Sequence, residues 1–123
     1  MKKILVILIL FIQFPANAAD KYTNFSLSSL EKARASGKTV VVNSYEPWCW
    51  SCRKQDKVLI NAKDEFKDVV FLTYQQGKHK DIAEALKVSV RTTIVVFKGE
   101  KEVARIIGQT GKPEIYSAIK KGI

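Results

Sequence analysis

The stretch YEPWCWSC, residues 45–52, contains both cysteines of this 123-residue chain, Cys49 and Cys52. Before it, residues 39–45 are rich in β-branched side chains and include three consecutive valines, which is typical of a strand covered on both faces. After it, apolar side chains recur at helical spacing and predict a helix over residues 49–66. Both cysteines therefore fall in the first turn of a helix that follows a central strand.

The spacing of the two cysteines favours chemical reactivity over a structural role. A disulfide between residues three apart closes a small ring and restricts the unfolded chain little. At the start of a helix, by contrast, unpaired N–H groups and the helix dipole stabilise a thiolate and lower its pKa. We therefore predict that Cys49 is the nucleophile, and that Cys52 resolves a mixed disulfide by attacking the sulfur of Cys49.

A structural or zinc-binding pair is the alternative interpretation of these cysteines. Tetrahedral zinc needs further cysteine or histidine ligands, and His79 is the one histidine of the chain. It lies in a lysine-rich stretch, where we expect it on the solvated surface. We predict no metal and no cofactor, because thiol–disulfide exchange moves two electrons without one.

The rest of the sequence alternates helical and strand patterns. The predicted helices span residues 28–37, opened by a capping box at Ser28, and 78–86, with a closing helix from Pro113; the predicted strands span 69–74, 93–97 and 102–107. Lys98, Gly99, Glu100 and Lys101 separate the last two strands and suggest a hairpin. This order predicts an α/β fold, in which a central mixed β-sheet is flanked by helices on both faces.

The N-terminus carries the pattern of an export signal. Lys2 and Lys3 precede an apolar run, residues 4–14, that is too short to span a bilayer comfortably. The sequence Ala-Asn-Ala that ends at residue 18 fits signal peptidase. We predict a signal peptide over residues 1–18 and one domain over 19–123, exported to the periplasm and soluble after cleavage; an uncleaved membrane anchor is the alternative.

The chain is basic, with 21 Lys and Arg against 12 Asp and Glu and a formal charge of +9. Removal of Lys2 and Lys3 with the signal would leave 19 basic residues against 12, a charge of +7. The lysines are scattered, and no stretch interleaves arginine with stacking aromatic side chains. We therefore expect a solvated basic surface and no nucleic-acid partner.

Residues 48–52, with the valine-rich strand before them and residues 97–100 after them, resemble the thioredoxin superfamily. Within it, residues 38–56 are similar to the C-terminal periplasmic domain of the electron transporter DsbD and to related thioredoxin-like proteins. The resemblance implies a thioredoxin fold and a redox-active disulfide, with Cys49 exposed and Cys52 shielded. It also implies protein thiol and disulfide substrates and a separate redox partner.

Four further residues are candidates for substrate binding. Trp48 and Trp50 flank the nucleophile and can offer an apolar platform to a partner polypeptide, although Trp48 could instead pack against the fold. Arg91 and Thr92 lie where the family places its partner-docking loop.

The sequence departs from the thioredoxin pattern at three positions. Asn43 stands where the family carries a buried acid, and an amide cannot act as a base. Thr92 stands where the family carries a cis-proline, so we expect a trans Arg91–Thr92 bond and a reshaped docking loop. No proline follows Cys52 until Pro113, which predicts a straighter helix.

These observations lead to one main functional hypothesis and two alternatives. The main one is an exported oxidoreductase that exchanges electrons with protein dithiols and disulfides, with reduction as the favoured direction. The first alternative is a non-catalytic thioredoxin-fold interaction module within an envelope assembly. The second is a metal ion or iron–sulfur cluster shared by two chains through four cysteines.

Overall fold

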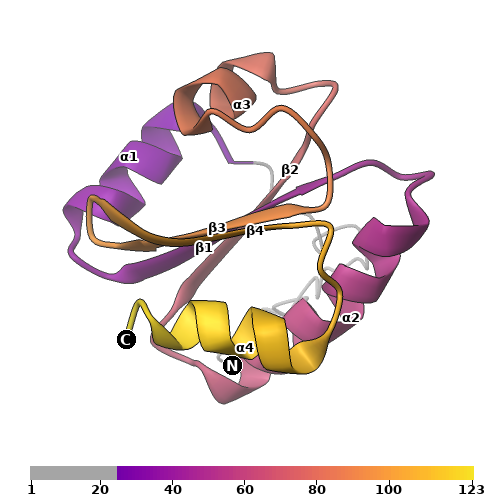
Figure 1. The fold of residues 1–123 in the computed structure, drawn as a ribbon. Coiled ribbons are helices and arrows are strands. Elements are labelled where there is room, and N and C mark those ends of the chain that lie inside the picture. The colour runs from indigo at the N-terminus through magenta and orange to yellow at the C-terminus, as the bar shows by residue number, and fades with distance from the viewer. Residues whose placement is uncertain (1–24) are drawn as a thin grey trace, which may run out of the picture.

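The computed structural model describes residues 25–123, which fold into alternating helices and strands (Figure 1). The helices are α1 (Leu27–Ala35), α2 (Trp50–Glu65), α3 (Lys80–Leu86) and α4 (Lys112–Lys120), and the strands are β1 (Thr39–Tyr45), β2 (Val70–Gln75), β3 (Thr93–Lys98) and β4 (Lys101–Ile107). This is the element order that the sequence predicts. The expected signal peptide and its cleavage site lie outside the described residues.

The strands form a mixed sheet in the order β2-β1-β3-β4. β1 pairs with β2 in parallel and with β3 antiparallel, and β3 pairs antiparallel with β4. Five consecutive residues of β1 are buried, which confirms the central, doubly covered strand expected from its valines. The predicted mixed sheet is therefore confirmed.

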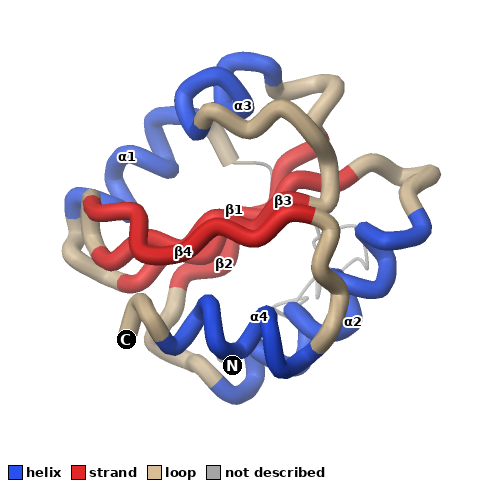
Figure 2. Tube along the Cα trace, viewed as in Figure 1, coloured by secondary structure: helices blue, strands red, loops and turns tan. Residues whose placement is uncertain are grey.

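Two apolar clusters hold the helices onto the sheet, with α1 and α3 over one face and α2 and α4 over the other (Figure 2). Side chains alternate between the faces along a strand, so Val40 and Val42 pack toward α1 and α3 while Val41 packs toward α2 and α4. The second cluster joins Leu59 of α2 to Ile115 of α4. Helix α2 is thereby fixed against the sheet along its buried face.

Two local features set the boundaries of α1 and of the β3–β4 hairpin. Helix α1 starts earlier than the expected cap at Ser28, because the hydroxyl of Ser26 accepts a hydrogen bond from the Ser29 N–H at 3.2 Å. The β3–β4 hairpin turns at Gly99, whose φ of 60° is a conformation that glycine adopts without strain.

Candidate redox site

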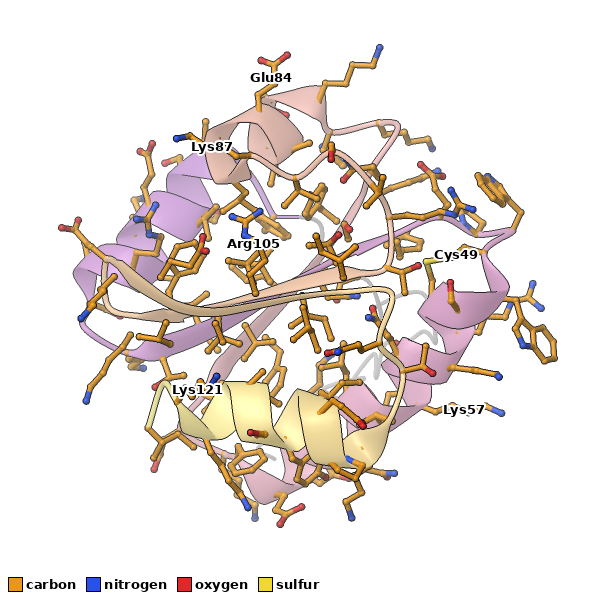
Figure 3. The ribbon with its side chains drawn as sticks, in the orientation of Figure 1. Cys49, Lys57, Glu84, Lys87, Arg105 and Lys121 are labelled. Atoms are coloured by element: carbon orange, nitrogen blue, oxygen red, sulfur yellow. A yellow bond between two sulfur atoms is a disulfide. The ribbon has the colours of Figure 1, made fainter. Side chains whose placement is uncertain are left out.

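The site lies where β1 ends and α2 begins. The Cys49 N–H donates to the carbonyl of Glu46 at 3.1 Å, which closes the turn that leads into the helix. The carboxylate of Glu46 accepts bonds from the Gly77 N–H and from Nε2 of Gln75, at 2.6 and 3.0 Å. The turn is therefore tied to the neighbouring end of β2, and Figure 3 shows Cys49 at this edge of the fold, beside α2.

Cys49 is the N-cap of α2 and forms a disulfide with Cys52. Its sulfur accepts a hydrogen bond from the Cys52 N–H at 3.2 Å, so it occupies the place of the usual oxygen cap. Helix α2 runs without interruption for 16 residues beyond this cap, as expected of a helix that lacks an internal proline. An N–H group and the positive end of the helix dipole thus point at the predicted nucleophile.

The burial of the two cysteines corrects one expectation. Cys52 is shielded as expected, but Cys49 is only 2% exposed, so the expectation of an exposed nucleophile is wrong for the disulfide form. The hydroxyls of Ser51 and Thr92 lie 3.4 and 3.3 Å from its sulfur and occupy space that solvent would otherwise fill. A partner must therefore displace one of these side chains to reach the sulfur.

Thr92 lies against both sulfurs. Its hydroxyl is 3.3 Å from Sγ of Cys49, 3.2 Å from Sγ of Cys52 and 2.9 Å from the hydroxyl of Ser51. Its φ of 64° lies in the left-handed region, which is unfavourable for a β-branched residue. No cis peptide bond occurs within residues 25–123, so the expected trans Arg91–Thr92 bond is confirmed.

Backbone hydrogen bonds hold Thr92 in this conformation. Its N–H donates to the carbonyl of Ser44 at 3.0 Å, and its own carbonyl accepts from the Gly108 N–H at 2.8 Å. The same carbonyl accepts from Nε2 of Gln55 at 3.0 Å. Bonds from β1, α2 and the end of β4 therefore position one residue against the disulfide.

Gln55 is a site residue that the sequence analysis missed. Its side chain is fully buried, and Nε2 donates to the carbonyls of Thr92 and Gln109, while Oε1 accepts from Nδ2 of Asn43 at 3.1 Å. A signal was present, because Gln55 shares the buried helix face of Cys52 and Leu59. A buried glutamine side chain needs hydrogen-bond partners, and the three bonds above provide them.

Asn43, where an acid was expected from the family pattern, is also buried, at 3% exposed. Its amide donates to Gln55 and makes a longer contact of 3.5 Å with the carbonyl of Ser44. The two buried amides that bond to each other here are neutral, and neither can accept a proton at neutral pH.

The phenol of Tyr74, on the neighbouring strand β2, is buried next to the register position of Ser44. Burial raises the pKa of Tyr74 to about 12, and the charge of Arg105 opposes this increase. Tyr74 therefore stays neutral throughout the physiological range.

Both tryptophans beside Cys49 are exposed, Trp48 at 66% and Trp50 at 70%, so Trp48 does not pack against the fold. The guanidinium of Arg91 lies 4.3 Å from the centre of the Trp48 ring, which links the turn before α2 to the loop before β3. Trp50 lines a surface pocket of about 200 Å³ with Arg53, Lys54 and Lys57. The structure thus groups three of the candidate substrate-binding residues around Cys49 on the surface, while Thr92 is buried beside the sulfurs.

His79 precedes α3 and makes no side-chain capping bond. Within residues 25–123, no group of three or more His, Cys, Asp or Glu side chains is arranged to hold a metal ion. Among the same residues, no helix has the length and apolar character needed to cross a membrane.

Comparison with known proteins connects this site to a family. Residues 21–121 match the family model for thioredoxin. A thioredoxin of Mycoplasma genitalium is 36% identical over 90 residues, which cover 73% of this chain and 88% of that protein. Thioredoxin-2 of Saccharomyces cerevisiae is 32% identical over 84 residues, which cover 68% of this chain and 81% of that protein.

Solved structures agree on the fold. Trxlp from Edwardsiella tarda matches with a TM-score of 0.73 at 25% identity, over 77% of this chain and 94% of that one. Mitochondrial thioredoxin 3 from Saccharomyces cerevisiae, in its oxidised form, matches with a TM-score of 0.69 at 23% identity, over 76% and 88%. With a family model that matches most of its length and relatives above 30% identity, the chain belongs to the thioredoxin family and is a thiol–disulfide oxidoreductase.

Proposed function

We propose that this protein is exported to the periplasm and reduces protein disulfides there, with Cys49 as nucleophile and Cys52 as resolving thiol. The observation that carries the chemical part is the hydrogen bond from the Cys52 N–H to the sulfur of Cys49 at the start of α2. After reduction of the disulfide, the same N–H and the helix dipole stabilise a thiolate on Cys49 and lower its pKa.

The reaction begins with the reduced pair. The Cys49 thiolate attacks one sulfur of a partner disulfide, and the other partner sulfur leaves as a thiolate that takes a proton from solvent. Cys52 then loses its proton and attacks the sulfur of Cys49, which releases the second partner sulfur. Two electrons reach the partner, the Cys49–Cys52 disulfide forms, and a second dithiol protein must reduce it again.

We assign partner binding to the exposed surface formed by Trp48, Trp50 and Arg91, while Thr92, whose backbone groups are already hydrogen-bonded, holds the loop that carries Arg91. The two exposed indole rings give a partner polypeptide apolar area beside the sulfur it must approach. Arg91 already contacts Trp48, so a partner that engages either side chain also acts on the loop that covers Cys49.

The proposed location rests on the N-terminal sequence. Lys2 and Lys3, the apolar residues 4–14 and the small residues before position 19 have the order of a cleaved signal. An N-terminus at Ala19 in protein purified from a periplasmic fraction is the expected result.

A non-catalytic interaction module is the second candidate. The near-complete burial of Cys49 favours it, because an enclosed sulfur reacts slowly unless the surrounding loop opens.

Trapping of mixed disulfides distinguishes the two. In the C52A variant, the proposed enzyme keeps partner proteins bound to Cys49, and dithiothreitol releases them; the matched C49A variant traps none. The wild type should also reduce insulin, with a reduction potential near the thioredoxin value of about −270 mV. If C52A traps no partner and the wild type does not reduce insulin, the protein is an interaction module. A reduction potential of about −120 mV would show that it oxidises its partners.

A further inference from the structure

The resolving thiol has to lose a proton inside the protein. Cys52 is only 4% exposed, and its sulfur becomes a nucleophile only as a thiolate. The buried amides of Asn43 and Gln55, which bond to each other, are neutral and cannot accept the proton. The proton must therefore leave Cys52 through other groups of the site.

Two hydroxyls connect the buried sulfur to the surface. Oγ1 of Thr92 lies 3.2 Å from Sγ of Cys52, and Oγ of Ser51 lies 2.9 Å from Oγ1 of Thr92. Ser51 is partly exposed at the start of α2. A hydroxyl donates one hydrogen bond while it accepts others, so two in sequence can pass a proton without any change in their own charge.

The conformation of Thr92 shows how firmly the first hydroxyl is placed. A φ of 64° is an unfavourable conformation for a β-branched residue. The hydrogen bonds from Gln55 and Gly108 to the carbonyl of Thr92 hold it there. Such a conformation persists where surrounding bonds enforce it, and here they direct the hydroxyl at both sulfurs.

We propose that Thr92 and Ser51 form a proton path from Cys52 to solvent, which takes the place of an internal base during resolution of the mixed disulfide. The inference rests on the proposed function. The Cys52 proton moves to Oγ1 of Thr92 as the hydroxyl hydrogen of Thr92 moves to Ser51, and the hydrogen of Ser51 moves to a water molecule at the surface. The electron pair left on Cys52 forms the bond to Cys49, and the bond from Cys49 to the partner breaks with its pair on the partner sulfur.

Stopped-flow reaction of the reduced protein with excess dithiobis-nitrobenzoate separates the two chemical steps. Attack by Cys49 releases the first thionitrobenzoate at a rate that rises with reagent concentration. Attack by Cys52 releases the second at a rate independent of concentration, which is the step under test. If no thionitrobenzoate is released by Cys49 at all, the proposed function fails, and this result differs from failure of the proton path.

The variants change one hydroxyl at a time. T92V keeps the branched shape and should slow the second phase by at least about tenfold, whereas T92S should restore it. S51A should slow it as well. T93V is the matched control, because the neighbouring Thr93 is also buried but its hydroxyl donates to the carbonyl of Val90; the second phase of T93V should stay within about twofold of wild type.

Chemical rescue separates a proton path from a structural effect. In T92A, added imidazole should accelerate the second phase in proportion to its concentration, while the wild type should not respond. An unchanged second phase in T92V would overturn the proposal. If the second phase is slow in D56N and normal in T92V, the proposal is also overturned. The carboxylate of Asp56, one helical turn after Cys52 in α2, would then be the proton acceptor.

Discussion

Gln55 offers the sharpest test of how the site is held together. We choose Gln55→Met, because methionine has a similar length and flexibility and leaves little cavity. The glutamine makes three hydrogen bonds, to Asn43 and to the carbonyls of Thr92 and Gln109. Its loss leaves the buried amide of Asn43 with only the 3.5 Å contact to Ser44. The carbonyl of Gln109 also loses this donor.

The expected cost follows from these lost partners. A buried polar group left without a hydrogen bond costs about 1 to 3 kcal/mol, so the loss at Asn43 lowers the free energy of unfolding by about that amount, and the carbonyl of Gln109, which belongs to an exposed residue, adds less. Urea denaturation of the oxidised protein, followed by circular dichroism, measures this difference. Gln109→Ala is the control, because the exposed side chain of Gln109 takes no part in the network. A loss in Q55M below about 0.5 kcal/mol would show that these bonds do not hold Thr92.

Three further predictions concern the sheet, the surface and the core. Because the pKa of Tyr74 is raised to about 12 in the fold, the folded state retains the phenolic proton longer than the unfolded state; stability should fall by about 3 kcal/mol between pH 10 and 12, and in Tyr74→Phe a titration of unfolding should lack this fall. Trp50→Ala should lower kcat/KM for insulin by about tenfold while leaving the reaction with dithiobis-nitrobenzoate unchanged, which steady-state kinetics can check. Ile115→Ala, at a position with 0% exposure, should cost about 2 to 5 kcal/mol in urea denaturation, whereas Ile123→Ala, at 64% exposure, should cost little.

The sequence predicts the architecture well, because the signals that define it are local. The valines of β1 and the helical spacing after Cys52 give the central strand and the helix that carries the site. The residues around Gly99 give the hairpin. The start of α1 is placed two residues late, because Ser26 and Ser28 both suit a cap, and only the three-dimensional structure shows which hydroxyl accepts the bond.

The site itself is only partly predictable. The position of Cys49 at a helix start follows from the sequence, but its burial does not, because the hydroxyl that covers it comes from Thr92, 43 residues away. Gln55 is missed for a similar reason, since its partners Thr92 and Gln109 lie 37 and 54 residues away. Periodicity places a residue on a helix face, but it does not identify the loop that will contact that face.

The backbone of Thr92 also limits which residues this position can accept. Proline fixes φ near −65°, so a change from the observed 64° would need a rotation of about 130°. Proline would also remove the N–H that donates to the carbonyl of Ser44. Thr92→Pro alone therefore does not fit the backbone of this loop, which would have to change its path and give up its hydrogen bond to β1.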